Sequence, residues 1–293
     1  MRITNNAIVG NMMKHLQDNM KNLDSLSQKL SSGKEFQFPS ENPIGAASSM
    51  QYDSLISASE QYQKNLNQAH DWLESSEINL TDTGEILHRA RELAVYGNTD
   101  SLTAEDRAKI AEEVKQLKEE YVNIANSKLG DRYLFSGQST DIKPFKYDDS
   151  EGEYNYEGDV NDIVREINDN SKISVNLNGD KVFSEGIEVL DNLYQGLRND
   201  DKDLLEKSIG RLEAESDKIS KFRAEIGAKM NRLDLTKSRL EEEYINLRRL
   251  QSENEDTDIA ETITELKMQE SVYRASLATG ARIIQPTLVD FLN

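Results

Sequence analysis

A seven-residue repeat of small and apolar side chains, running from Gly45 to Ala94, constrains the fold of this chain more than any other feature. Alternately every third and every fourth residue of this stretch is Gly, Ala, Ser, Thr, Leu or Tyr. A spacing that averages 3.5 residues places these side chains on one face of an α-helix, where a left-handed coiled coil forms its seam. At about 1.5 Å per residue, such a helix is roughly 75 Å long. The repeat comprises positions 45, 48, 52, 55, 59, 62, 66, 69, 73, 76, 80, 83, 87, 90 and 94.

A second long apolar stripe lies in the last third of the chain. A single amphipathic helix is not stable alone in water, so we expect this late stripe to pack against the early one. A shorter third stripe covers 110–124 and follows Ser101 and Thr103, which are candidates for its helix cap. The late stripe consists of Leu205, Ile209, Leu212, Ile219, Ile226, Met230, Leu233, Leu240, Tyr244 and Leu247.

The hydrophobic pattern changes between these helices. Residues 133–185 contain short runs that often alternate and are separated by Gly, which favours a small β-rich insertion. Within it, Asn178-Gly179 lies between two β-prone runs and predicts a two-residue hairpin turn. A helix of about 187–199 then leads back to the late stripe.

The two ends of the chain add one amphipathic segment each. We expect them to pair with each other and, since two short helices bury little surface, to form an assembly interface with further subunits. Asp258 and Glu261 are placed like a capping pair at the start of the second segment. The candidate interface consists of Leu16, Met20, Leu23, Leu26 and Leu30 near the start, and of Ile263, Leu266, Tyr273, Leu277, Ile284, Leu288 and Phe291 near the end.

These patterns predict a mainly α fold with a β-rich insertion: a long coiled-coil rod, with the N- and C-terminal helices paired at one end and the small β domain at the other. The expected divisions, in chain order, are an N-terminal assembly helix with a spacer, the first rod helices, the β-rich insertion, the second rod helices and a C-terminal assembly helix. Their ranges are 1–44, 45–132, 133–185, 186–250 and 251–293.

The composition argues against several classes of function. The chain has 54 acidic and 35 basic residues, a net charge of -19, which disfavours binding to nucleic acid or to an anionic membrane surface. There is no cysteine, and His15, His70 and His88 lie too far apart to form a local metal motif. No catalytic or phosphate-binding motif is present, so we expect no enzyme activity, no cofactor and no metal site.

Several linked motifs resemble the flagellin family. Residues 23–49, "LDSLSQKLSSGKEFQFPSENPIGAASS", are similar to the N-terminal signature of that family, in which a Leu-rich helix ends at Leu-Ser-Ser-Gly. The run from Pro39 to Ala46 and the segment "GDRYLFSG" at 130–137 look like its hook-associated branch rather than its filament proteins. The closing "MQESVYRASLATGARIIQPTLVDFL" is similar to family C-termini. The resemblance covers about 1–137 and 205–293.

This resemblance implies a structural role in the bacterial flagellum, as an adaptor that joins the hook to the flagellin filament. The partners it implies are hook-associated protein 1, flagellin, a flagellar export chaperone and further copies of the chain in a ring at the hook tip. It also implies secretion through the flagellar type III export channel without a cleaved signal peptide, in keeping with an N-terminus that lacks an apolar h-region. The alternative is a flagellin that forms the filament itself.

Overall fold

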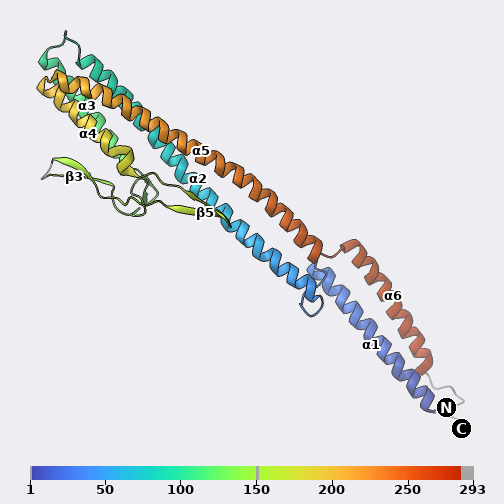
Figure 1. Cartoon of the computed structure of the whole chain (residues 1–293). Helices are drawn as coiled ribbons and strands as arrows, with labels where there is room; N and C mark the ends of the chain where they lie inside the picture. The colour runs from blue at the N-terminus through green and yellow to red at the C-terminus, as the bar shows by residue number, and fades with distance from the viewer. Residues whose placement is uncertain (1, 150–151, 285–293) are drawn as a thin grey trace. The chain divides into compact units, whose positions relative to one another are not determined.

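The computed structural model describes residues 2–149 and 152–284, and side chains from 7 to 282 within them (Figure 1). The chain forms two compact units. The first consists of the residues up to Ala58 and from Glu243 onward, and the second of Ser59–Glu242. Two long helices, α2 (Pro43–Gly97) and α5 (Lys202–Glu255), contribute residues to both units. None of the described helices is long and apolar enough to span a bilayer.

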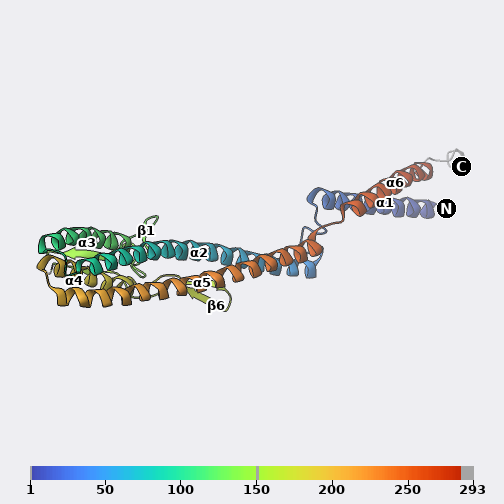
Figure 2. The ribbon, with the colours of Figure 1, turned by 90° about the horizontal axis from the view of Figure 1, so that it is seen from above.

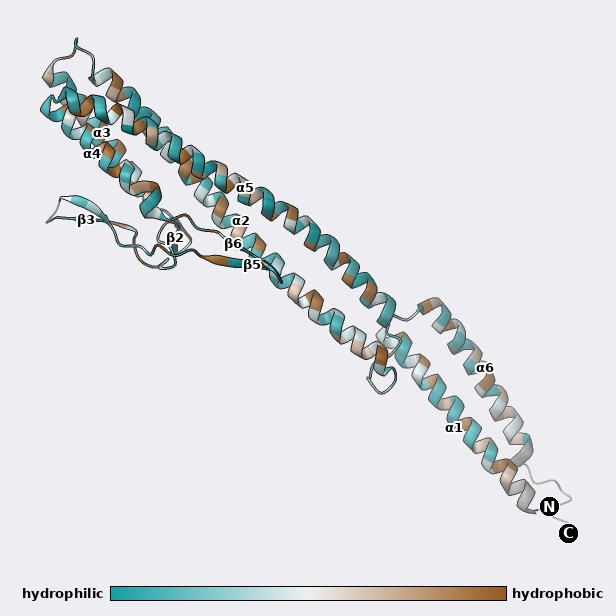
Figure 3. Ribbon diagram, viewed as in Figure 1, coloured by the Kyte–Doolittle hydropathy of each residue, from teal (hydrophilic) through white to brown (hydrophobic). Residues whose placement is uncertain are grey.

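In the second unit α2 and α5 run antiparallel, and the two predicted stripes form its core. Leu73, Leu80 and Leu87 are fully buried, and Leu212 and Leu233 belong to the same hydrophobic cluster. Figure 3 shows hydrophobic positions recurring along both helices between hydrophilic ones. Ion pairs flank the seam, with Glu77 Oε1 lying 2.9 Å from Arg223 Nη2 and Arg91 Nη2 lying 3.3 Å from Glu213 Oε1. The prediction that the early and late stripes pack together is confirmed.

Two small polar residues of the seam form hydrogen bonds within their own helix. Ser76 is buried and donates its hydroxyl to the carbonyl of Trp72 at 2.8 Å, and the buried Thr83 donates to that of Asn79 at 2.7 Å. A hydroxyl that donates a hydrogen bond to the carbonyl four residues earlier in its own helix needs no further partner in the core. Ser76 and Thr83 therefore occupy the seam with their hydroxyls satisfied, whereas the buried hydroxyl of Ser59 has no hydrogen-bond partner among the described residues.

Two shorter helices complete the second unit. They are α3 (Ala104–Ala125) and α4 (Glu185–Asn199), which pack on each other. In Figures 1 and 2 both lie alongside α2 and α5 near the turn that joins α2 to α3. Of the two predicted capping residues, Thr103 occupies the N-cap of α3, where its hydroxyl accepts a hydrogen bond from the backbone N–H of Asp106 at 3.2 Å.

A buried arginine ties the two helix turns of this unit together. The side chain of Arg107 is 4% exposed. It donates to the carbonyls of Gly97 and Thr99, both at 2.8 Å, and pairs with the carboxylate of Asp200 at the end of α4. The guanidinium thus satisfies the carbonyl of Gly97, which the end of α2 leaves without a helical donor, and adds a second donor to that of Thr99 in the turn.

The strands of the described residues form three antiparallel two-stranded ladders rather than one sheet, and the first of these, at 128–133, begins before the predicted insertion. The strands are β1 (Lys128–Leu129) with β2 (Arg132–Tyr133), β3 (Phe145–Asp148) with β4 (Glu153–Tyr156), and β5 (Val164–Asn168) with β6 (Ser171–Ser174).

The insertion shares its core with the helices. Phe183 makes edge contacts with Tyr121 of α3 and with Phe135, at centroid distances of 5.5 and 4.8 Å. The β5–β6 ladder is also tied to α2, because the Asn65 side chain donates to the carbonyl of Glu166 at 2.8 Å. The insertion is therefore part of the second unit rather than a separately packed domain.

The predicted hairpin at Asn178-Gly179 is wrong. The residues after it form a single π-helical turn, Asp180–Ser184, instead of a strand. The Asn178 side chain accepts hydrogen bonds from the backbone N–H groups of Asp180 and Lys181 at 2.9 and 3.3 Å, so it starts this turn. Gly179 has φ -60°, and a β-carbon there would lie 2.3 Å from the carbonyl oxygen of Phe135. Glycine is needed at this position for its size, not for a left-handed conformation.

The first unit holds the two terminal helices. These are α1 (Arg2–Ser32) and α6 (Ile259–Ile284), which pack on each other. The predicted fold class, mainly α with a β-rich insertion and with paired terminal helices, is confirmed.

Candidate assembly interface

The pair of α1 and α6 carries the candidate interface. Its helices are antiparallel and lie side by side in Figures 1 and 2. The seam of α1 follows the same alternation of three and four residues as the long helices, and every seam position is only half-buried. These positions are Val9, Met12, Leu16, Asn19, Leu23, Leu26 and Leu30.

The seam of α6 is more polar than that of α1. It comprises Thr262, Leu266, Gln269, Tyr273, Ser276 and Gly280. Asn19 of α1 donates to the hydroxyl of Ser276 at 3.4 Å and accepts from the amide of Gln269 at 3.3 Å. A polar contact inside a coiled-coil seam fixes the register of the two helices at a cost in stability.

The helices approach each other closely beyond this polar layer. A β-carbon at Gly280 would lie 1.6 Å from Cε of Met12, so the Met12 side chain packs directly on the α6 backbone. Asn19, Gln269 and Gly280 were not predicted, because in the two terminal segments only large apolar residues were taken as seam positions. The spacing of three and four residues, extended there to polar and small residues, would have found them.

The structure divides the predicted interface residues into two groups. Leu16, Leu23, Leu26, Leu30, Leu266 and Tyr273 are half-buried in the α1–α6 pair. Met20, Ile263 and Leu277 are 62%, 42% and 45% exposed. The side chain of Ile284, and Leu288 and Phe291 entirely, lie outside the described part of the chain.

The pair buries little apolar surface. Between residues 7 and 30 of α1, no side chain is fully buried. A hollow of about 550 Å³ lies between the helices and is lined by Ile8, Met12 and Val272 among others. Two helices whose large apolar seam residues are only half-buried are marginal in water, so further apolar contacts from outside the chain would stabilise them. The large apolar side chains left exposed on the pair are Ile8, Met13, Met20, Ile259, Ile263, Met268, Val272 and Leu277.

A short backbone ladder closes the pair where α1 ends and α6 begins. The N–H of Glu35 donates to the carbonyl of Glu255 at 2.6 Å, and the N–H of Thr257 donates to that of Gly33 at 2.9 Å. Lys34 forms an ion pair with the carboxylate of Glu255. Burial raises the pKa of Glu255, but hydrogen bonds from Lys34 and Ser49 outweigh it, and the net pKa is lowered.

The run from Pro39 to Ala46, which the sequence likened to the hook-associated branch, has a structural explanation. Asn42 accepts a hydrogen bond from the N–H of Gly45 at 2.9 Å and so caps α2, which starts at Pro43. Proline suits the first helical position because its missing N–H would have no partner there. A β-carbon at Gly45 would lie 2.8 Å from the ring of Phe36. Residues 36–45 therefore form a compact turn that depends on Asn, Pro and Gly at these places.

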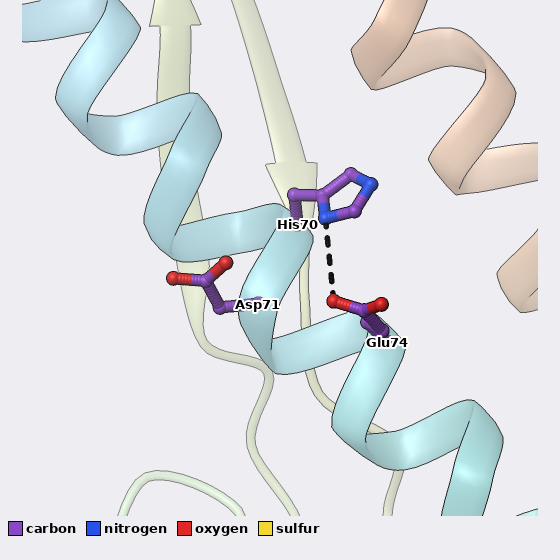
Figure 4. Close-up of side chains that lie close together, drawn as sticks. All are labelled: His70, Asp71 and Glu74. Carbon is purple, nitrogen blue, oxygen red and sulfur yellow. Dashed lines mark ion pairs between the residues drawn. The ribbon is translucent and has the colours of Figure 1, made fainter.

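The described residues offer one group of side chains with metal-ligand chemistry, His70, Asp71 and Glu74 on α2. Nδ1 of His70 lies 3.9 Å from Glu74 Oε2, and Figure 4 shows these two facing each other while the Asp71 carboxylate points away. All three belong to one helix, and Asp71 and Glu74 are exposed. Zinc ligands lie about 2 Å from the ion and surround it. This arrangement is that of a surface ion pair rather than a closed metal site.

The comparisons with known proteins agree with the resemblance found in the sequence. Residues 3–140 match the bacterial flagellin N-terminal helical region, and residues 209–292 match the bacterial flagellin C-terminal helical region. The chain belongs to the flagellin family. The first matched region contains nearly all of α1 and the second contains α6, the two helices that carry the candidate interface. The strands β3 to β6 lie between the two matched regions.

Two curated relatives and one solved structure illustrate the similarity. The chain is 23% identical over 304 residues to flagellar hook-associated protein 3 of Escherichia coli strain K12, covering 94% of this chain and 95% of that protein. It is 27% identical over 304 residues to flagellin of Bacillus subtilis strain 168, with 97% of each chain covered. The crystal structure of Bacillus cereus FlgL matches with a TM-score of 0.61 and 26% identity, over 69% of this chain and 99% of that one.

Proposed function

We propose that this chain is a structural protein of the bacterial flagellum that joins the hook to the flagellin filament. The observation that carries this proposal is the likeness to Bacillus cereus FlgL, of which 99% is covered at 26% identity. The match to flagellar hook-associated protein 3 along nearly the whole of both chains supports it. The asparagine-capped, proline-started turn at Asn42–Gly45 is the local feature that resembles the hook-associated branch.

Assembly would occur through the α1–α6 pair. The exposed side chains of Met20, Ile263 and Leu277, together with the half-buried seam, are apolar surface that neighbouring subunits would cover. Burial of a large apolar side chain contributes about 1.5–3 kcal/mol before ordering costs. A surface of this kind is marginal within one subunit and becomes stable when many subunits repeat the contact.

The proposed partners follow from the position at a junction. One face of a ring of these chains would contact hook-associated protein 1 and the other would contact flagellin. An export chaperone would cover the apolar α1–α6 surface before secretion through the flagellar type III channel, since an exposed apolar patch of this kind favours aggregation.

A second candidate function is that of a flagellin. The 27% identity to Bacillus subtilis flagellin over 97% of both chains favours it. A filament subunit and a junction subunit use the same kind of helical interface, so the interface itself does not separate them. The two kinds of subunit differ in copy number and in the part of the flagellum that is lost when the gene is deleted.

Deletion of the gene in its own host tests the proposal. If the chain is a junction protein, the deleted strain is non-motile, keeps its hooks, and releases unassembled flagellin into the medium. Expression of the intact chain restores attached filaments. Loss of the flagellin band itself, with no released flagellin, would instead show that the chain is the filament subunit.

A further inference from the structure

An open polar groove lies beside α2 in the second unit. Its volume is about 830 Å³, within the roughly 300–1,000 Å³ range of sites that bind small molecules. Helix α2 supplies Gln68, Asp71 and Trp72, strands β2 and β5 supply Arg132 and Arg165, and the loop after β2 supplies Thr140. The groove belongs neither to the α1–α6 pair nor to the seam between α2 and α5.

The charge of the groove differs from that of the chain as a whole. In a protein with 54 acidic and 35 basic residues, two arginines line this groove and only one carboxylate, that of Asp71, does. Neither Arg132 nor Arg165 lies within ion-pair distance of a carboxylate among the described residues, although most other arginines on this unit are paired. Two such guanidinium groups lining one hollow form a binding surface for a carboxylate, which arginine recognises through paired hydrogen bonds.

Trp72 gives the groove a flat apolar wall. It is the only tryptophan of the chain and is 8% exposed, and its Nε1–H has no hydrogen-bond acceptor among the described residues. Buried tryptophan N–H groups usually find a partner. Amide and hydroxyl groups of Gln68, Gln138 and Thr140 lie around the same hollow.

The Gln138 amide is held in place, because it donates to the backbone carbonyl of Asp162 at 2.9 Å. Its side-chain oxygen remains an acceptor for a ligand hydroxyl. The wall of the groove thus combines an aromatic ring, donors, acceptors and two cations.

We propose that this groove binds an acidic sugar, a saccharide that carries a carboxylate as well as hydroxyl groups. The carboxylate would lie against Arg132 and Arg165, and the hydroxyls would bond to the amide and hydroxyl groups of the wall. Asp71 distinguishes this ligand from an acidic protein segment. Its carboxylate accepts hydrogen bonds from sugar hydroxyls, whereas ionised aspartate and glutamate side chains have no donor to offer it. The inference does not depend on the place of the protein in the flagellum.

Calorimetric titration of the full-length protein with sodium trigalacturonate at low salt tests the proposal. The fluorescence of Trp72, the single tryptophan, provides a second readout in the same buffer. We expect saturable binding of trigalacturonate with a change in that fluorescence, and no binding of the neutral trisaccharide maltotriose. The double variant Arg132→Gln/Arg165→Gln should raise the dissociation constant at least tenfold.

The matched control is Arg239→Gln, which removes an exposed arginine of α5 in the same unit and should bind as the wild type does. Circular dichroism of each variant checks that the fold is retained. Absence of trigalacturonate binding, or equal binding by the double variant, would overturn the proposal. Binding of hexaglutamate in place of trigalacturonate, lost in the same double variant, would also overturn it and show that the groove takes an acidic protein segment.

Discussion

The carboxyl group of Glu215 on α5 contacts the carboxylate of Glu185 on α4, and Lys218 of α5 forms ion pairs with both. The side chain of Glu215 is 2% exposed, and Lys218 Nζ lies 2.9 Å from it and 3.1 Å from Glu185. Burial raises the pKa of Glu215 to about 7, although the hydrogen bond from Lys218 opposes this and the neighbouring Glu185 adds to it. The hydrogen bonds from Glu215 and Lys218 lower the pKa of Glu185. Of the two carboxyl groups, Glu215 is therefore the one whose pKa is raised in the folded protein.

This pair makes stability depend on pH. The folded pKa of Glu215 is above its unfolded value of 4.5, so its contribution is fully present below pH 4.5 and is lost as the pH rises through 7. The variant Glu215→Gln keeps a hydrogen-bond donor and cannot ionise. We expect it to resemble the wild type at pH 5 and to be more stable by about 2–3 kcal/mol at pH 8, at roughly 1.4 kcal/mol per pKa unit. Urea unfolding at the two pH values measures this difference.

The control for that experiment is Glu206→Gln, which removes an exposed carboxylate of the same helix. Its effect should be the same at both pH values. If Glu215→Gln also has the same effect at pH 5 and pH 8, Glu215 is not protonated in the folded protein.

Removal of Arg107 should destabilise the second unit more than removal of an exposed arginine. Arg107→Ala removes the side-chain donor to the carbonyls of Gly97 and Thr99 and the ion-pair partner of Asp200. The loss of these buried hydrogen bonds costs about 1–3 kcal/mol, which thermal or urea unfolding would register. Arg89→Ala removes a half-exposed pair with Glu113 and should leave the midpoint unchanged. Equal effects of the two variants would contradict the role assigned to Arg107.

Charged substitutions at exposed positions of the α1–α6 pair should prevent assembly and leave the folding of the free chain intact. Met20 and Leu277 are 62% and 45% exposed, so the double variant Met20→Asp/Leu277→Asp should change the stability of the free chain by no more than about 0.5 kcal/mol. Incorporation into flagella should be lost, because each subunit contact would bury an unpaired charge. Immunoblots of isolated flagella measure incorporation, with Asn22→Asp as the matched control. Normal incorporation of the double variant would remove these two residues from the interface.

The apolar tail is predicted from the sequence to act in assembly. Removal of residues 281–293, or their replacement by a Gly/Ser segment of equal length, should leave the stability of the free chain almost unchanged and abolish incorporation. Burial of Leu288, Phe291 and the other large apolar side chains of the tail contributes on the order of 10 kcal/mol gross in an assembly. A loss of several kcal/mol of stability in the free chain would place the tail in the chain's own core instead.

The long helices could be predicted from the sequence because their core is a simple one-dimensional repeat. Leu73, Leu80 and Leu87 recur every seven residues, and the structure buries them all. The same rule predicted Leu16, Leu23 and Leu30, which the structure only half-buries, since a repeat gives the face of a helix and not the depth of its burial. Depth depends on how many other helices cover that face.

The remaining features depend on contacts that no local pattern encodes. Glu215 continues the seam of α5, but a carboxylate at a seam position is stable only because Glu185 and Lys218 lie across from it. The turn after Asn178 depends likewise on the approach of the Phe135 carbonyl to Gly179. Partners distant in the chain decide such positions, so a reading of neighbouring residues could not place them.

The location of the protein in isolated flagella tests the central claim most directly. Immunogold electron microscopy with an antibody against the chain measures it on intact hook-filament preparations from the native host. We expect a single band of label at the boundary between hook and filament, with a copy number far below that of flagellin. Label along the whole length of the filament would contradict the proposed junction role and identify the chain as a filament subunit.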